Sequence, residues 1–236
     1  MDFSLLVPGD EGWGDEMLRG AAMTLAVSVC AYAFGILVGI LFAALKLSGS
    51  WALRAVAELY TTVVRGVPEL LIIYLVFYGG GQLLRAVASG VFGYEGYIDL
   101  PLFLTGVVCI GVSAGAYNTE VIRGAVQAVP RGQIEAAIAI GMRPSTRFWR
   151  VLVPQVARHA LPGLGNVWQL TLKETSLISV IGLVEIMRQA AVASGSTKEP
   201  FTFYLLAGLL YLGLTSISNR GFNRAEAWAN KGVRTG

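Results

Sequence analysis

The sequence predicts an all-α membrane protein with five transmembrane helices, and three observations support this fold class. Of the 236 residues, 55% are hydrophobic and only 14% are charged, against roughly 25% charged in ordinary soluble domains. Five stretches are mainly apolar over about the 20 residues that a helix needs to cross a bilayer. The segments between them are alternately rich and poor in Arg and Lys, as expected when a chain crosses a membrane repeatedly.

The five predicted spans follow from the apolar stretches in order. The first covers residues 18–45 and is long enough to tilt. The second covers residues 68–84, where Pro68 suits the first position of a helix and Glu69 suits its first turn, because the helix dipole favours an anion there. The three glycines at 79–81 weaken this span. The third, fourth and fifth spans cover residues 101–122, 161–183 and 201–217, and the fourth is the most polar.

The charges between the spans indicate the direction of each crossing. The leading segment contains five acids and no base before Arg19, whereas the segment 123–158 contains six arginines. The next most basic segments are the connection 46–65 and the chain end 220–236. The loop after span two contains one base, Arg85, and two acids, Glu95 and Asp99. Because Arg and Lys concentrate on the cytoplasmic side, we expect the N-terminus outside and the C-terminus inside. The acidic start also lacks the basic region of a signal peptide, so no cleaved signal is expected.

Small residues within the spans indicate close helix packing. Gly35 and Gly39, and likewise Gly111 and Gly115, place two glycines on one helix face, which allows another helix to approach closely. A specific dimer contact is the alternative. The two cysteines lie inside apolar stretches without a metal or redox pattern, so we expect them to pack as small apolar groups.

The connection between spans three and four is unusually long, and its sequence is not of low complexity. Residues 133–140 favour a short helix that Gly141 and Pro144 end. Ser145 can cap a second short helix, which Pro154 is expected to interrupt. Two such helices form a compact knob at the membrane surface. An amphipathic element whose arginines rest on anionic lipid headgroups is the alternative interpretation.

The same loop resembles a known family motif. Glu135-Ala136-Ala137, then Gly141 after three residues, then Val151-x-Val153-Pro154 after nine, is similar to the EAA loop of binding-protein-dependent ABC importer permeases, with Val where Ile and Leu are usual. In that family the loop forms a coupling helix that docks on an ATPase subunit. The residues that the resemblance assigns to ATPase docking are Glu135, Ala136, Ala137, Gly141, Arg143 and Pro154.

The resemblance extends over nearly the whole chain. The element Arg65-Gly66-Val67-Pro68, the segment 114–125 and the run Lys173-Glu174-Thr175-Ser176-Leu177 are similar to the polar amino-acid uptake subfamily. Within it, the chain resembles Q-type permeases for histidine and other basic amino acids and for opines such as octopine and nopaline. The five-helix core of that family agrees with the span count.

The resemblance implies a multi-pass subunit of the bacterial cytoplasmic membrane. Residues 1–17 would be periplasmic, 18–220 would form the five-helix permease domain with its coupling loop at about 129–160, and 221–236 would be a cytoplasmic tail. The implied partners are two copies of an ABC ATPase, a second homologous permease or a second copy of this chain, a periplasmic solute-binding protein and the lipid membrane, without nucleic acid. The chain lacks a GxxxxGK[ST] loop, so ATP and Mg are expected on the ATPase, with no cofactor and no catalysis on this chain.

Polar residues within the spans are the candidates for a substrate path, because an unpaired charge at membrane depth is costly. Lys173 and Glu174 lie about 12 residues into span four, and Ser176 adds a hydroxyl. They line a wet path or pair with a neighbouring helix, such as the one that carries Glu120. Adjacent positions point about 100° apart, so these two are not expected to pair with each other.

Four further residues are path candidates with structural alternatives. Glu120 could hold a substrate cation or lie at the interface, and Glu69 could contact substrate or only begin a helix. Tyr117 and Asn118 could orient a polar ligand or serve helix packing. Three rival functions remain. An intramembrane enzyme would need a catalytic constellation within the spans, and none is visible. An ion-coupled secondary transporter usually shows internal repeats, which this chain lacks, and a non-transporting membrane scaffold is the third.

Overall fold

The computed structural model describes residues 3–7, 9, 12–92 and 100–231, and all the regular structure in these residues is helical. Several charges used above to infer orientation, at positions 2, 10, 11, 95, 99 and 234, lie outside the described residues. The first half contains a short 3-10 helix at Phe3–Leu6, α1 (Gly14–Leu47), α2 (Trp51–Gly66), α3 (Glu69–Tyr74), a π turn at Leu75–Gly79, α4 (Gly80–Phe92) and α5 (Leu102–Ala128).

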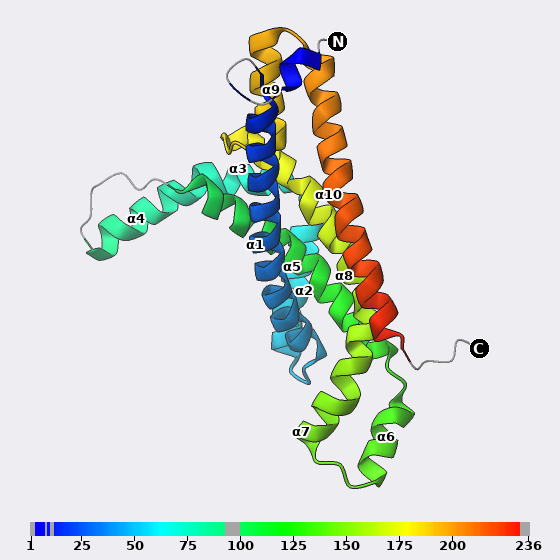
Figure 1. Ribbon diagram of the computed structural model, residues 1–236. Helices are drawn as coiled ribbons and strands as arrows, with labels where there is room; N and C mark the ends of the chain where they lie inside the picture. The colour runs from blue at the N-terminus through cyan, green and yellow to red at the C-terminus, as the bar shows by residue number, and fades with distance from the viewer. Residues whose placement is uncertain (1–2, 8, 10–11, 93–99, 232–236) are drawn as a thin grey trace.

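The second half begins with the loop singled out above. It contains α6 (Arg131–Ala139), α7 (Pro144–Arg147), a π turn at Phe148–Leu152, α8 (Val153–Glu174), a 3-10 helix at Thr175–Ile181, α9 (Ile186–Thr197) and α10 (Pro200–Ala229). Figure 1 shows the N-terminus and α9 at one end of the molecule and α6 and α7 at the opposite end, toward which α1, α5 and α10 run.

Four helical segments in the described residues are long and apolar enough to cross a membrane: Gly14–Leu47, Glu69–Val87, Leu102–Ala128 and Pro200–Ala229. A fifth crossing results if the bent pair Pro144–Ile181 and Ile186–Thr197, with 49° between its parts, is one broken span. The predicted all-helical membrane fold is therefore confirmed, with four to five apolar spans where five were predicted.

Several predicted boundaries were wrong. Pro154 does not end the helix: it is the second residue of α8 and directly follows the π turn Phe148–Leu152, through which the helix continues. Ser145 is not a cap either, since Arg143 precedes the first residue of α7. Helix therefore continues from Pro144 through Glu174, so the fourth span begins well before residue 161. The connection 46–65 contains the amphipathic α2. The helix α10 continues to Ala229, so the first residues of the predicted tail, 221–236, are helical.

The glycine pairs pack α1 against α5, as predicted. A Cβ atom added at Gly35 would lie 2.9 Å from the Ala114 Cβ and 3.0 Å from the carbonyl oxygen of Gly111. One added at Gly39 would lie 2.6 Å from the Asn118 Cβ. The two backbones can come this close only because these positions lack side chains.

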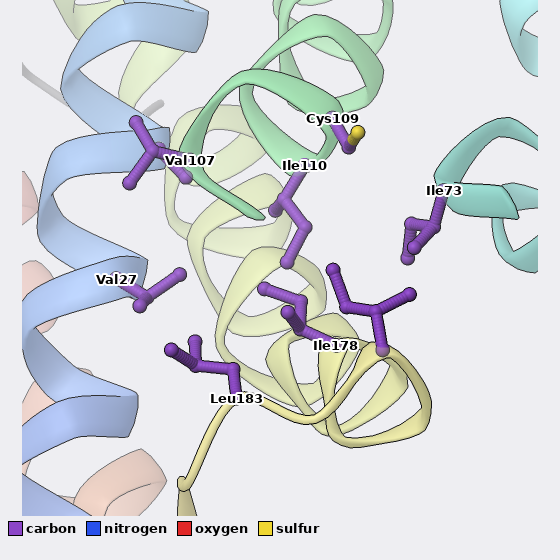
Figure 2. Close-up of a cluster of buried hydrophobic side chains, with 9 residues drawn as sticks. Val27, Ile73, Val107, Cys109, Ile110, Ile178 and Leu183 are labelled. Atoms are coloured by element: carbon purple, nitrogen blue, oxygen red, sulfur yellow. The ribbon is translucent and has the colours of Figure 1, made fainter. Parts of the chain in front are cut away.

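Two apolar clusters hold the helices together. In Figure 2, Val27 of α1, Ile73 of α3 and Ile110 of α5 converge on Ile178 of the 3-10 helix after α8. Cys109 is buried in this cluster as a free thiol, which confirms its packing role, whereas Cys30 is exposed on α1. The second cluster joins α1, α9 and α10 near the N-terminus and centres on fully buried side chains, among them Met17, Ile186 and Phe203.

Glu185 fixes the break between the 3-10 helix and α9. It is fully buried, yet its carboxylate accepts hydrogen bonds from the Met187 and Arg188 backbone N–H groups at 2.9 and 2.8 Å, which caps α9. It also accepts from the hydroxyls of Tyr211 on α10 at 2.9 Å and Thr24 on α1 at 3.4 Å. A buried charge is tolerated only when its oxygens are satisfied in this way, so Glu185 ties three helices together at one point.

Candidate translocation path and coupling surface

A cavity of about 410 Å³ opens between α2, α5 and α8. Arg65, in the last turn of α2, lies at one side with its guanidinium 5.4 Å from the centre of the Tyr117 ring on α5. Polar side chains of α8, among them Lys173, face the same space. The lining residues are Arg65, Tyr117, Glu120, Val121, Gly163, Asn166, Val167, Gln169, Leu170 and Lys173.

Glu120 lines this cavity but its charge is already compensated. Its Oε1 accepts a hydrogen bond from the Lys46 Nζ at 2.5 Å, and its Oε2 accepts from Arg123 at 2.8 and 3.0 Å. Lys46 is buried and also pairs with Glu58 of α2 at 2.7 Å. The four side chains form a neutral cluster of two cations and two anions that connects the ends of α1, α2 and α5.

Lys173 and Glu174 point to different surroundings, as predicted. Lys173 is exposed and faces the cavity, whereas Glu174 is directed toward the carboxyl of Glu69, which also lies near the Ser113 hydroxyl. Each of the two carboxyls has a buried oxygen without a hydrogen-bond partner among the described residues. Glu69 begins α3, so its predicted helix-start role is confirmed.

The other path candidates are distributed differently. Tyr117 faces the cavity. Asn118 is fully buried against Gly39 of α1, and no hydrogen bond reaches its amide from the described residues. The Ser176 hydroxyl donates to the Lys173 carbonyl at 2.7 Å, so it satisfies the end of α8.

The knob at the far end consists of α6, a glycine turn and the start of the long helix. Gly141 has φ +75°, a left-handed conformation that costs other residues roughly 1–2 kcal/mol. Its N–H donates to the Ile138 carbonyl at 2.9 Å and the Met142 N–H donates to the Ala137 carbonyl at 3.0 Å. This is the usual glycine ending of a helix, and it returns the chain toward α7.

The surface of the knob combines apolar and charged side chains. Ile140 and Trp149 are 78% and 68% exposed. Of the predicted docking residues, Ala137 is buried and five are exposed, namely Glu135, Ala136, Gly141, Arg143 and Pro154. Glu135 and Arg131 of α6 border a second cavity of about 600 Å³, which lies between α6 and the end of α5. Exposed apolar residues rimmed by charge are typical of a surface that another protein covers.

Residues 35–226 of the chain match the family described as "Binding-protein-dependent transport system inner membrane component". The chain belongs to this family. It is therefore a multi-pass permease subunit of an ABC importer in the cytoplasmic membrane.

Individual members of the binding-protein-dependent permease family are similar over 88% or more of this chain. The nopaline transport system permease protein NocQ of Agrobacterium fabrum is 68% identical over 235 residues, covering 100% of both chains. The octopine transport system permease protein OccQ of Rhizobium meliloti is 53% identical, covering 97% of this chain and 96% of the relative. The histidine/lysine/arginine/ornithine permease protein HisQ of Escherichia coli is 40% identical over 88% of this chain and 90% of its own.

A solved structure of an amino acid ABC transporter with histidines superposes with a TM-score of 0.77 at 31% identity, covering 91% of this chain and 94% of that chain. The MetNI methionine ABC transporter, in an inward-facing conformation, superposes with a TM-score of 0.73 at 16% identity, covering 92% and 97%. At that identity only the permease fold is shared.

The structure brings together residues that the sequence did not connect. Arg65, Asn166 and Gln169 line the cavity, although only the charges and hydroxyls of the fourth span and its neighbours were predicted to do so. The position of Arg65 directly before a predicted span was the available signal. Lys46 and Glu120 are 74 positions apart, and no local pattern indicates such a pair.

Proposed function

We propose that this permease imports polar amino acids with basic side chains, or opine-type derivatives of them, along a path that includes the 410 Å³ cavity. The relatives named for nopaline, octopine and basic amino acids favour this substrate class. The observation that supports it best is the charged lining of the cavity by Arg65, Lys173 and Glu120, because charged side chains within a membrane domain are expected to face a polar path or a partner.

The path residues have different roles in this proposal. Lys173 and Tyr117 face the solute directly, and Glu120 takes part as a member of the neutral cluster with Lys46 and Arg123. Glu69 and Glu174 are not among the residues that line the cavity, and their carboxyls are directed toward each other beside the path; in this proposal they form a carboxyl pair behind its wall. Asn118 and Ser176 support the path walls.

In the membrane, the chain crosses five times, with the N-terminus in the periplasm and the C-terminus in the cytoplasm. The broken pair Pro144–Ile181 and Ile186–Thr197 is the fourth crossing in this topology. The knob of α6 and α7 then lies in the cytoplasm, on the same side as the basic segment 123–158. Residues 1–17 lie on the periplasmic side, where a solute-binding protein delivers the substrate.

The knob docks on a separate ATPase, two copies of which serve a pair of permeases. ATP and Mg bind to the ATPase, and the second permease is a homologue or another copy of this chain. Helix continues from Pro144 at the knob to Glu174 beside the cavity, a length of about 46 Å at 1.5 Å per residue. A displacement of the knob on ATPase closure therefore moves Lys173 and Glu174 with it.

Purification of the tagged chain from its native membrane, in mild detergent, tests this function. We expect an ABC ATPase and a second permease to co-purify, and the ATPase to be lost from the Glu135→Ala/Gly141→Asp variant but retained by Arg224→Gln, an exposed position on α10. A chain that purifies alone under every nucleotide condition would overturn the importer proposal in favour of an ion-coupled transporter or a scaffold.

A further inference from the structure

A third cavity lies where the chain turns from α1 into α2, beside α5 and toward the end of the molecule that carries the knob (Figure 1). It has a volume of about 300 Å³, and all of its lining side chains are polar or charged: Lys46, Arg54, Glu58, Arg123 and Gln127. We call it the corner pocket. With 34 residues, α1 is about 51 Å long, whereas the hydrocarbon core of a bilayer is about 30 Å thick. The last turn of α1, at one wall of the pocket, can therefore lie at the level of the lipid headgroups.

The corner pocket has one more cation than the neighbouring acids compensate. The neutral cluster described above supplies two of its three cations together with their counter-charges. The third is Arg54, which is exposed and takes part in no ion pair between described residues. Its guanidinium donates to the Ser48 carbonyl at 3.5 Å, which is long for such a bond, and a guanidinium has five N–H donors. The pocket thus presents a positive charge and free donors.

A second polar group of the pocket can serve as a donor. The Gln127 Oε1 accepts a hydrogen bond from Arg123 at 3.0 Å, so the amide nitrogen is the end of this side chain that can donate to a ligand. A guanidinium and an amide beside each other suit a group with several acceptor oxygens, such as a phosphate, since charge-assisted hydrogen bonds to arginine are strong.

An exposed apolar surface lies next to this charged pocket. Val56, Leu59 and Val63 of α2 are 55%, 65% and 50% exposed, and their spacing places them on one face of the helix. Trp51, the first residue of α2, is 80% exposed, and tryptophan is enriched where a membrane protein crosses the interface between headgroups and hydrocarbon. We call the three aliphatic side chains the apolar face of α2. A free phosphate has no use for such a face, but an acyl chain does.

We infer that the corner pocket binds the phosphate of an anionic phospholipid in the cytoplasmic leaflet, with an acyl chain along the apolar face of α2. Basic pockets between transmembrane helices on the cytoplasmic side are suited to anionic headgroups, and an amphipathic helix lies at the interface with its apolar side toward the acyl chains. The inference rests on the proposed topology, which places the C-terminal end of α1 at that leaflet. Only the neutral cluster separates the lipid from the translocation cavity, because Glu120 lines the cavity while Lys46 and Arg123 line the pocket.

The test uses the full-length chain, purified in mild detergent together with the subunits that it retains. The complex is titrated with phosphatidylglycerol or with phosphatidylcholine of the same acyl chains, and native mass spectrometry measures the bound lipid. We expect the wild type to bind phosphatidylglycerol about tenfold to a hundredfold more tightly, as for one hydrogen bond to a charged group. Excess inorganic phosphate should not displace it.

Three variants separate the headgroup from the acyl chain. Arg54→Gln should remove the preference for phosphatidylglycerol, and the charge-preserving Arg54→Lys should keep most of it. Leu59→Ser should weaken both lipids to the same extent, because it changes only the apolar face of α2. Arg224→Gln removes the same charge from an exposed position on α10 outside the pocket and is the matched control.

Four results would overturn the lipid site while leaving the importer proposal intact. Equal affinity of the wild type for both lipids would show that no anionic headgroup is selected. An equal loss in Arg54→Gln and Arg224→Gln would show that the lipid responds only to overall positive charge. Displacement by inorganic phosphate would make the ligand a free anion, and loss of the second permease from Arg54→Gln would make Arg54 a subunit contact. The proposed function fails by a different sign, namely absence of ATP-driven uptake in the wild-type importer with its binding protein.

Discussion

Replacement of Gly39 by Ala is predicted to destabilise the fold at the contact between α1 and α5. The added Cβ would lie 2.6 Å from the Asn118 Cβ and 3.2 Å from backbone atoms of Asn118 and Thr119, whereas carbon atoms prefer separations of about 3.5–4.0 Å. Neither obstacle is the flexible end of a side chain, so the two helices must move apart by about 1 Å. Overpacking of this kind costs up to about 3 kcal/mol.

Helix propensity offsets part of that cost. Ala is favoured over Gly inside a helix by about 1 kcal/mol, so the expected net loss for Gly39→Ala is about 2 kcal/mol in the free energy of unfolding. Gly213→Ala is the matched control, because it lies in the interior of α10 with nothing within 4 Å of the added Cβ. That variant should gain up to about 1 kcal/mol, and the two variants should therefore differ by about 3 kcal/mol.

The assay is unfolding of the purified chain in mixed micelles with increasing SDS, followed by far-ultraviolet circular dichroism. A Gly39→Ala variant that unfolds at the same SDS fraction as the wild type would refute the close backbone contact. An equal loss in Gly213→Ala would show that any added methyl group in these helices has the same effect, and the steric reasoning would be wrong.

Three other substitutions follow from the same contacts. Gly141→Asp should abolish ATP-driven uptake while the protein still inserts, because the left-handed turn at φ +75° no longer forms without strain; uptake at the wild-type rate would contradict the docking role. Lys46→Met should lower the free energy of unfolding by about 1–3 kcal/mol, since Glu120 loses one of its two cationic partners, and Lys46→Met/Glu120→Gln should recover part of it in the same SDS titration. Glu185→Gln should cost about 1–3 kcal/mol because an amide has one acceptor oxygen where the carboxylate uses two; a stability equal to the wild type would remove Glu185 from the list of anchors.

Hydropathy was sufficient to find the apolar helices but not the amphipathic ones. Residues 18–45 and 201–217 read directly as spans because a bilayer demands a continuous apolar stretch, and α1 and α10 contain them. By contrast, α2 is 16 residues long and carries Arg54, Glu58 and Arg65, so its sequence has the charge content of a connection. Only its contacts with α1 and α5, such as the hydrogen bond from the Tyr60 hydroxyl to the Val112 carbonyl, show its place in the fold.

Proline positions explain why the start of the fourth span was misplaced. Pro154 suggested a break between short elements, yet α8 contains both Pro154 and Pro162. Pro154 directly follows the π turn Phe148–Leu152, and this local change in backbone hydrogen bonding lets the helix continue past a residue without an N–H. Pro162 is inside the helix, where membrane helices tolerate proline because neighbouring groups satisfy the freed carbonyl. A local sequence rule cannot see those neighbours.

A path residue could be predicted where its charge stood alone inside an apolar stretch. It could not be predicted where the residues that pair with it come from distant helices. Lys173 stood out because a charge inside an apolar stretch is costly, and it does face a cavity. The environment that leaves its charge uncompensated depends on contacts between distant elements. Lys46 of α1 and Arg123 of α5 form ion pairs with Glu120. Glu174 faces Glu69, the first residue of α3.

Lys173 and Glu174 are adjacent in the chain but face different surroundings because they lie at the end of α8. Glu174 is the last residue of α8, and the chain continues as the 3-10 helix Thr175–Ile181, which is wound more tightly than an α-helix. The cluster around Ile178 anchors that 3-10 helix, and Glu185 anchors the break that follows it. The end of this helical segment near Glu185 is thus fixed to α1 and α10, while its other end leads to the exposed knob. A load applied at the knob is therefore resisted near Ile178 and Glu185, directly beyond the turn of α8 that carries Lys173.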